Sequence, residues 1–293
     1  MGSYDKGETE MSLSVVNYFP QGLAKGEAFC NRVEERKRLI RNINTCRHML
    51  IMSPRRYGKS SLILYSLKEA DFTYTEVDLF VAVNAKMVEE QILRGVKDLF
   101  TKISSPLEQI VSIVKDYIKK LKSKWIVGTD GLSIELIPDK ENDTISNIME
   151  ALQMLENLLK KKRRKACFFI DEFQEIGILD ENRAIEGAIR HVAQSTEYLS
   201  FVFSGSHRHI LANMFHDRSR PLYKLCESIE IERIHEEHYF DFLNKIAKKT
   251  LNKKLDENVL REILNKTERH PYYVNTLCNK LWTEYAPSTF TPY

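Results

Sequence analysis

The stretch from His48 to Ala70 has the residue types and the spacing of a loop that binds phosphate. An apolar run from Met49 to Met52 is followed by Ser53-Pro54, by Gly58-Lys59-Ser60, and then by leucine and isoleucine at helical spacing. This order predicts a strand, a loop and a helix. At such a junction the backbone N–H groups and the helix N-terminus face an anion, the Lys59 ammonium reaches the β- and γ-phosphates, and the Ser60 hydroxyl ligates Mg²⁺.

The predicted loop departs from the G-x-x-x-x-G-K-[ST] pattern at one position, because Ser53 replaces the first glycine. Gly-Lys-Ser alone is weak evidence, since the tripeptide occurs by chance about once in a few thousand positions. An ordinary helix start with exposed serines is the alternative, and the flanking strand and helix favour the phosphate-binding interpretation. The residues expected to contact the nucleotide here are Pro54, Arg55, Arg56, Tyr57, Gly58, Lys59, Ser60 and Ser61.

Two carboxylates form a second candidate site, directly after the apolar run from Ala166 to Ile170. An unbroken apolar run is typical of a parallel strand that is buried on both faces, and the carboxyl ends of such strands face ligands. We therefore predict that Asp171 holds the Mg²⁺ shell and that Glu172 polarises the water that attacks the γ-phosphate. The alternative is a buried strand whose aspartate only caps the next helix. The additional presence of Lys59 makes that alternative the weaker one.

The elements around these two sites predict an α/β fold. Further strands are expected over residues 72–80, 198–206 and 228–232, and two short strands near 125–137 suggest an inserted hairpin. Asn31 and Glu34 have the spacing of a capping box, which predicts a helix from there to Asn44. Other helices are expected over residues 87–103, 107–121, 145–159 and 181–194.

The pattern from Glu236 onward is entirely helical and predicts a small C-terminal lid. We therefore divide the chain into a loose N-terminal lead-in (1–25), an ATPase core (26–234), the helical lid (235–286) and a tail (287–293). The six cations at 160–165 are consistent with a nucleic-acid contact, but a solvated loop after a helix C-terminus is the favoured interpretation.

Composition and charge exclude several classes of protein. With 43% hydrophobic and 29% charged residues among 293, the chain can bury a large core, and a formal charge of +3 does not by itself indicate nucleic-acid binding. The five cysteines are odd in number and lack a C-x-x-C pair, which favours reduced thiols. No apolar run reaches the roughly 20 residues of a membrane span, and no signal-peptide core is evident, so we expect a soluble, cytoplasmic protein without a membrane partner.

Three segments together resemble the archaeal-type ATPase family of prokaryotes. They are Phe-x-Asn-Arg-x-x-Glu at 29–35, Ser-Pro-Arg-Arg-Tyr-Gly-Lys-Ser-Ser-Leu at 53–62, and Phe-Phe-Ile-Asp-Glu-Phe-Gln at 168–174. This family belongs to the AAA+ and STAND branch of the P-loop NTPases and is related to the origin-recognition ATPases. The resemblance extends over residues 25–285. It identifies the loop as a Walker A motif and the strand end as a Walker B motif, and it implies a parallel five-stranded sheet of order 5-1-4-3-2 with flanking helices.

The resemblance also implies roles for residues outside the two motifs. Asn31 and Arg32 would lie beside the adenine, and Ser204, with Ser206 as a weaker candidate, would sense the γ-phosphate. Arg220 is the preferred candidate for an arginine finger, which acts on the nucleotide of its own or a neighbouring subunit. His270 would make a sensor-2-like contact, although Arg269 replaces the glycine that precedes this histidine in the family.

These features favour an Mg²⁺-dependent ATPase that hydrolyses ATP slowly and acts as a switch, with ATP or ADP bound and self-association possible. One alternative is a non-hydrolysing module that binds nucleotide or DNA for assembly, with DNA contacts through a further C-terminal domain. A P-loop kinase for small molecules is less favoured, because it would not need Glu172 directly after Asp171. The sequence does not identify the partner or the regulated process.

Overall fold

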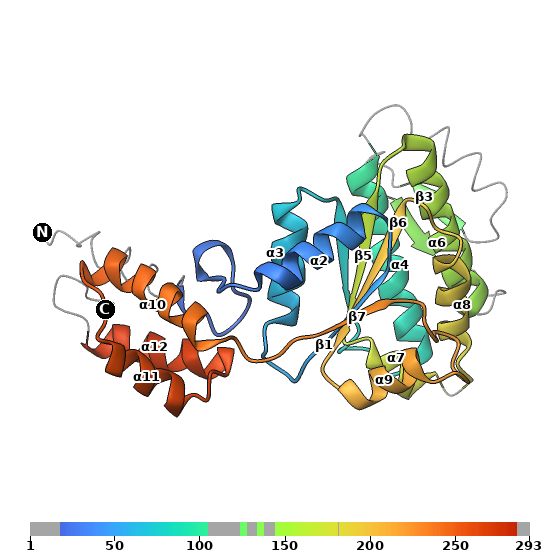
Figure 1. Cartoon of the computed structure of the whole chain (residues 1–293). Helices are drawn as coiled ribbons and strands as arrows, with labels where there is room; N and C mark the ends of the chain where they lie inside the picture. The colour runs from blue at the N-terminus through green and yellow to red at the C-terminus, as the bar shows by residue number, and fades with distance from the viewer. Residues whose placement is uncertain (1–17, 105–123, 128–133, 138–143, 181, 286–293) are drawn as a thin grey trace, which may run out of the picture. The chain divides into compact units, whose positions relative to one another are not determined.

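The computed structural model describes residues 18–104, 124–127, 134–137, 144–180 and 182–285 (Figure 1). The helix predicted over 107–121 and the tail predicted over 287–293 lie outside these residues. The chain forms two compact units. The sheet unit consists of Lys37–Pro54 and Leu67–Glu230, and the loop and lid unit consists of Met1–Arg36, Arg55–Ser66 and Ile231–Tyr293.

The sheet unit is built on five parallel strands. They are β1 (Met49–Met52), β2 (Tyr74–Asp78), β5 (Ala166–Asp171), β6 (Leu199–Gly205) and β7 (Glu227–Glu230), in the spatial order β2-β5-β6-β1-β7. Numbered along the chain as core strands, this order is 5-1-4-3-2 read from the β7 edge, so the predicted topology is confirmed. β1, β5 and β6 are buried along their whole length, as their unbroken apolar runs predict.

Helices cover the sheet and connect its strands. On one face lie α4 (Ala85–Ile103), α6 (Thr144–Lys162) and α8 (Ala184–Ala193), side by side in Figure 1. The connections also include α3 (Lys59–Glu69), α7 (Gln174–Leu179) and α9 (Arg208–His216), whereas α2 (Val33–Asn44) precedes β1. Two short antiparallel strands, β3 (Lys124–Val127) and β4 (Ile134–Ile137), pair where the sequence predicts a hairpin.

His48 fixes β1 against its neighbours in the sheet unit. Its Nε2 lies 2.8 Å from the Ala193 carbonyl oxygen and its Nδ1 accepts from the Phe201 backbone N–H at 3.1 Å. This pair of contacts requires a neutral ring that donates from Nε2, because a protonated Nδ1 cannot accept. Burial lowers the pKa of His48, and the bond to the Ala193 carbonyl opposes that shift.

This lowered pKa predicts a loss of stability in mild acid. The unfolded chain binds a proton at His48 below the ordinary histidine pKa, near 6.5, while the folded chain resists it, so stability falls as the pH decreases through this range. We expect this residue to contribute up to about 1.4 kcal/mol to the pH dependence of unfolding over the first unit below pH 6.5. Urea unfolding at two pH values should show a smaller pH dependence for His48→Gln than for the parent.

The control for this measurement is His209→Gln, because His209 is exposed on α9. The stability of the His209→Gln variant should depend on pH in the same way as that of the parent. If His48→Gln also matches the parent, then proton uptake at His48 does not contribute to acid sensitivity.

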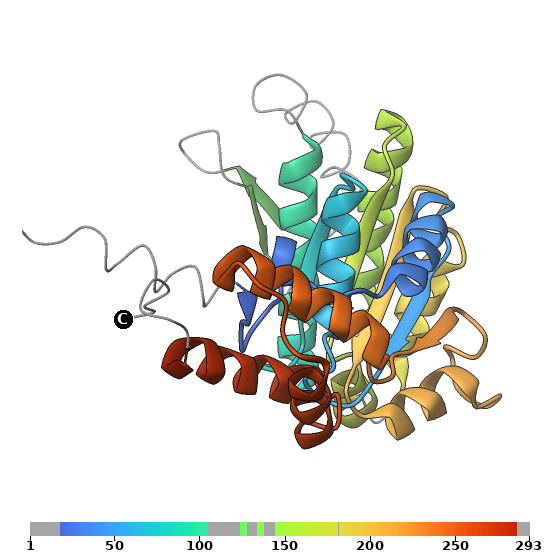
Figure 2. The same ribbon diagram turned by 60° about the vertical axis from the view of Figure 1, so that its left-hand side comes forward.

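The loop and lid unit contains three helices that pack around their own core. They are α10 (Glu236–Leu251), α11 (Glu257–Lys266) and α12 (Pro271–Tyr285), drawn in orange to red in Figure 2. Tyr239, Leu264 and Trp282 are among the residues buried between them. All three lie in the region from Glu236 onward that the sequence predicts to be helical, and α12 begins at Pro271, where proline fits a first helical position.

Phe19 shows that the N-terminal lead-in is not loose throughout. Its side chain is fully buried, with its ring 4.9 Å from that of Trp282 and 6.4 Å from that of Phe242. The Asn275 amide donates to the Pro20 carbonyl at 2.8 Å. This segment therefore belongs to the lid core, which the sequence did not indicate because the contact joins residues more than two hundred positions apart.

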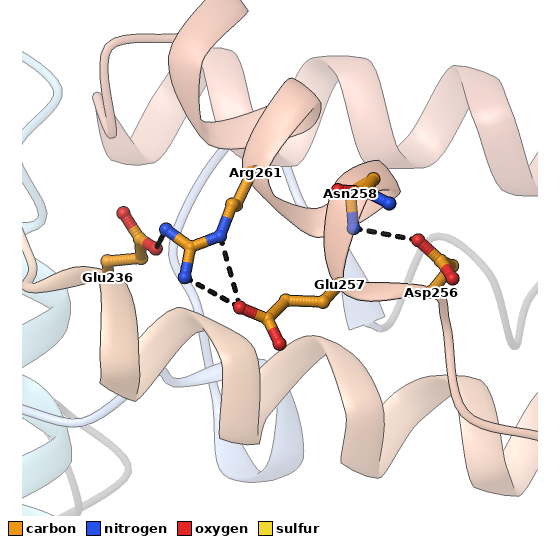
Figure 3. A network of polar contacts seen from close by, with 5 residues as sticks. All are labelled: Glu236, Asp256, Glu257, Asn258 and Arg261. Carbon is orange, nitrogen blue, oxygen red and sulfur yellow. Dashed lines mark hydrogen bonds and ion pairs between the residues drawn. The ribbon is translucent and has the colours of Figure 1, made fainter.

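Polar contacts join the first two lid helices (Figure 3). Arg261 of α11 donates to Glu257 in its own helix at 2.6 Å and to Glu236, the first residue of α10, at 2.7 Å. Asp256 caps α11 by accepting from the Asn258 N–H at 2.8 Å. These exposed contacts stabilise the helix ends by modest amounts and set their alignment. Among the described residues, none of the helices is both long and apolar enough to span a bilayer.

Candidate functional site

The predicted phosphate-binding loop has the backbone geometry of an anion site. The Gly58 carbonyl accepts from the Leu62 N–H at 2.9 Å, so α3 begins at Lys59 and the N–H groups of its first turn point out of the helix N-terminus. Gly58 has φ +88°, a conformation that strongly favours glycine, and Arg56 is also left-handed, at φ +64°. Lys59 is buried, with 6% of its surface exposed.

Arg32 holds this loop through its backbone. The guanidinium donates from Nη2 to the Tyr57 carbonyl at 3.4 Å and to the Glu232 carbonyl at 2.6 Å, and its Nη1 pairs with Glu35 at 3.2 Å. The side chain is 7% exposed. Arg32 thus connects the loop with the segment that leads into the lid, and its predicted proximity to the adenine remains a prediction.

The helix that follows Arg32 begins one residue later than the sequence predicts. The Arg32 carbonyl accepts from the Arg36 N–H at 2.9 Å, and α2 starts at Val33, so Arg32 directly precedes the helix. Asn31 has φ +57°, outside the extended region typical of an N-cap. The helix predicted from the capping-box spacing is present, but Asn31 and Arg32 both have left-handed backbones, a geometry that the spacing rule does not consider.

Aromatic and basic side chains of the lid contact the loop within the same unit. The rings of Tyr57 and His270 meet edge-on with centroids 4.7 Å apart, and the Arg56 guanidinium lies 4.0 Å from the Tyr272 ring centre. Arg233 donates from Nε to the Tyr57 hydroxyl at 3.3 Å. The loop side chains are therefore in contact with α12 and with the segment before α10.

His270 lies among these cations. Burial lowers its pKa, and the charges of Arg233 and Arg56 lower it further. A neutral imidazole is therefore favoured at neutral pH. The edge-on contact with the Tyr57 ring places His270 against the loop. A sensor-2-like contact between His270 and the nucleotide remains a prediction.

Two other loop residues have partners that the sequence did not indicate. The Ser61 hydroxyl accepts from the Ala24 backbone N–H at 3.0 Å, which ties the N-terminal segment to α3. Ser53, at the position of the missing glycine, is fully buried and its hydroxyl donates to the Pro54 carbonyl at 3.0 Å. The buried Ser53 hydroxyl thus has a hydrogen-bond acceptor in the adjacent residue.

The predicted carboxylates lie at the carboxyl end of β5, in the middle of the sheet unit. Asp171 ends the strand and pairs in register with Asp78 on β2. The Ser204 hydroxyl, on the neighbouring β6, donates to Asp171 Oδ1, which also accepts from the Glu172 N–H at 2.9 Å. The structure therefore brings the predicted Mg²⁺ ligand and the predicted sensor serine together. Burial, helped by the charges of Asp171 and Glu172, raises the pKa of Asp78.

Glu172 is held by two further residues. Its Oε2 accepts from Gln174 Nε2 at 2.6 Å, from the Ser206 hydroxyl at 2.8 Å and from the Ser206 N–H at 3.3 Å. Its backbone has φ +50°, which is uncommon for a residue other than glycine. Sequence reasoning had considered Ser206 only as a weaker sensor candidate and had missed Gln174, although the glutamine stands in the Asp-Glu-Phe-Gln segment.

Arg220 lies inside the sheet unit. It forms an ion pair with Glu186, whose side chain is fully buried, while the Arg220 side chain is 10% exposed. Burial raises the pKa of Glu186 to about 7, and the Arg220 charge opposes this shift. This placement weighs against the predicted arginine finger, because a guanidinium committed to a buried carboxylate is not presented to a nucleotide of another subunit.

The basic run at 160–165, which begins in the last turn of α6, also makes internal contacts. Lys162 donates to the Ile103 carbonyl at 3.0 Å and Lys165 donates to the Asn44 carbonyl at 2.6 Å. Lys160 lies 3.4 Å from the Glu197 carboxylate. Cations engaged in this way support the loop before β5 and favour the solvated-loop interpretation over a nucleic-acid contact.

Metal binding by side chains alone has little support. Among the described residues there is no group of three or more histidine, cysteine, aspartate or glutamate side chains that could hold an ion. His207, His209 and His216 are exposed. An Mg²⁺ ion that is held mainly by nucleotide phosphates and water needs only one or two protein oxygens, so the metal-binding roles predicted for Asp171 and Ser60 remain predictions.

Comparison with solved structures supports the fold. The Walker-type ATPase of Pyrococcus abyssi is 16% identical to this chain, with a TM-score of 0.63 over 88% of this chain and 69% of that one. The ORC1 protein of Aeropyrum pernix, solved in complex with DNA, is 13% identical, with a TM-score of 0.54 over 90% of this chain and 62% of that one. The ORC2 protein of the same organism, solved in ADPNP and ADP complexes, is 13% identical, with a TM-score of 0.53 over 84% and 61%.

These likenesses and the strand order define the fold class. The chain has the fold of the AAA+-like P-loop ATPases. It spans only about three fifths of the length of the two Aeropyrum structures. No protein-family model matches the sequence, and no similar curated protein was found.

Proposed function

We propose that this chain binds Mg²⁺-ATP and hydrolyses it slowly, as a nucleotide-dependent switch in the cytoplasm. The observation that carries the proposal is the fully buried strand β1, which lies between β6 and β7 and is parallel to both, and whose chain continues through a left-handed Gly58 into the helix that begins at Lys59. This is the arrangement in which backbone N–H groups and a lysine bind phosphates. The likeness to a Walker-type ATPase supports the same chemistry.

Each predicted residue has a defined role in the proposal. The first turn of α3 and the Lys59 ammonium bind the β- and γ-phosphates, and Ser60 and Asp171 contribute oxygens to Mg²⁺. The metal, when bound, neutralises charge that develops on the phosphates. Glu172 accepts a proton from the attacking water, and Ser204 orients Asp171 through their hydrogen bond.

Contacts between the phosphate-binding loop and the lid provide a physical basis for the proposed switch. Arg56 and Tyr57 belong to the loop, and both contact lid residues. A phosphate that draws Arg56 toward itself would remove the cation from the Tyr272 ring, so nucleotide binding and lid contacts are linked. The Arg32 bonds to Tyr57 and Glu232 provide a second link.

Loss of the loop lysine should weaken nucleotide binding. Lys59→Ala removes a charge-assisted contact, for which roughly 1.5–3 kcal/mol is expected, so the Kd for ATP should rise about ten- to a hundredfold. Isothermal titration calorimetry with Mg²⁺-ATP on the whole chain measures this directly.

The matched control is Lys68→Ala, which removes an exposed lysine from the same helix. It should leave the Kd for ATP unchanged. Equal ATP affinity in the parent and in Lys59→Ala would show that the loop does not bind phosphate and would refute the proposed function.

ATP turnover by the parent protein distinguishes the non-hydrolysing alternative from the proposed function. It predicts tight ATP binding with no release of phosphate from the parent protein, whereas the proposed function predicts slow release. DNA binding, suggested by the ORC1 complex, is an alternative role for which the internally bonded basic run gives no support.

A further inference from the structure

We infer that Gln174 and Ser206 are positioning residues that orient the Glu172 carboxylate, and that Gly205 makes room for the Gln174 side chain that does so. This inference rests on the proposed function, because it takes Glu172 as the group that activates water. It concerns contacts within the sheet unit only.

The first observation is the convergence of donors on one carboxylate oxygen. Gln174 Nε2 and the Ser206 hydroxyl approach Glu172 Oε2 at 2.6 and 2.8 Å, and the Ser206 N–H at 3.3 Å. Gln174 begins α7, and Ser206 follows β6, so the carboxylate is held from two separate elements. A carboxylate held from two directions keeps one orientation, which a base acting on a positioned water requires.

The second observation is the burial of the Gln174 amide. The residue is fully buried, and among the described residues its Oε1 has no hydrogen-bond partner. Only the amide nitrogen can donate to a carboxylate, which assigns Nε2 to the Glu172 side. An unpaired buried oxygen opposes folding, and an apolar side chain of this size would avoid it. The hydrogen bond that the Gln174 amide donates to Glu172 gives this buried glutamine a role that an apolar side chain could not fill.

The third observation explains the glycine at the end of β6. A Cβ atom at Gly205 would stand 2.0 Å from Gln174 Oε1 and 2.9 Å from a methyl carbon of Leu211. No real Cβ tolerates the first distance, so any larger residue would move the amide away from Glu172. The backbone of Gly205 itself has no left-handed conformation, so space rather than φ accounts for this glycine.

The backbone of Glu172 adds a fourth observation. Glu172 has φ +50°, a left-handed backbone that persists in a glutamate only where its surroundings hold it. The bond from its N–H to Asp171 and the donors on its carboxylate together supply that restraint.

The test compares three variants with a matched glycine control. Gln174→Met keeps the volume of the side chain and removes its donors, Gly205→Ala displaces the amide without removing a partner, and Ser206→Ala removes one donor. Gly187→Ala is the control, because a Cβ at that position of α8 meets no atom within 4 Å. Each whole chain is assayed for Mg²⁺-ATP turnover, for ATP affinity by calorimetry, and for folding by urea unfolding.

We expect Gln174→Met and Gly205→Ala to lower turnover about ten- to a hundredfold, the scale of a small misplacement of a catalytic group, with unchanged Kd for ATP. The loss in Ser206→Ala should be smaller, because the Ser206 N–H remains, and Gly187→Ala should match the parent. In a Glu172→Gln background, none of the three substitutions should reduce turnover further, because they act through Glu172.

Other results would overturn the inference. If Glu172→Gln abolishes turnover but folded Gln174→Met and Gly205→Ala proteins hydrolyse ATP at the parent rate or faster, then the donors do not position the base. A further loss in the Glu172→Gln background would likewise assign these residues a different role. If Glu172→Gln itself hydrolyses ATP at the parent rate, the catalytic assignment and this inference fail together, while ATP binding through Lys59 remains separately testable.

Discussion

Glu172→Gln should lower ATP turnover by about a hundred- to ten thousandfold, the range typical of a lost general base, while ATP still binds. Glutamine keeps the shape and much of the hydrogen bonding of glutamate, but it cannot accept the proton of the attacking water. Single-turnover hydrolysis with excess protein measures the loss, and calorimetry measures the Kd for Mg²⁺-ATP.

The control for this variant is Glu90→Gln, which changes an exposed glutamate of α4 in the same unit. Its turnover should equal that of the parent. Turnover of Glu172→Gln at the parent rate would show that another group activates the water. Loss of ATP binding in the same variant would instead assign Glu172 to the nucleotide contact.

Arg220→Ala should destabilise the protein by about 3–5 kcal/mol, since it leaves the buried Glu186 carboxylate without its partner. The pKa of Glu186 is raised to about 7 by burial, and removal of the opposing Arg220 charge should raise it further. A carboxyl group with a raised folded-state pKa favours folding when protonated, and this contribution is lost as the pH rises through that pKa. The deficit should therefore be larger near pH 8 than near pH 5.5.

Unfolding in guanidinium chloride at both pH values measures this loss of stability. The control is Arg218→Ala, which changes an exposed neighbour and should leave the free energy of unfolding within about 0.5 kcal/mol of the parent. Replacement of both partners, as Arg220→Met with Glu186→Leu, should recover much of the stability. The arginine-finger hypothesis makes a different prediction. Under it, Arg220→Ala would remain stable, and ATPase activity per subunit would rise with protein concentration in the parent but not in the variant.

Local patterns were sufficient to predict most of the elements. The spacing of apolar residues located β1, β5 and β6 and the three lid helices, because burial of one face or of a whole strand determines which positions are apolar. The resemblance of three motifs supplied the strand order, which the pairing of the strands confirms. No single segment could have supplied it, since strands far apart in the chain become neighbours.

Local patterns failed where the outcome depends on a distant partner. Asn31 has the spacing of an N-cap, but its backbone and that of Arg32 are left-handed, and the Arg32 guanidinium donates to the Tyr57 and Glu232 carbonyls. Phe19 lies in a polar N-terminal stretch, and only its packing against Phe242 and Trp282 shows that it is a core residue.

The sequence by itself determined the chemistry that this protein offers: a glycine, a lysine and a serine after a strand, and two carboxylates at the end of another strand. Residue type fixes charge and proton affinity, so these features are evident without coordinates. Only the tertiary structure decided how the side chains are used. It joined Ser204 to Asp171, placed Gln174 and Ser206 on Glu172, and committed Arg220 to Glu186. Such contacts depend on which strands become neighbours, and that is a property of the whole chain.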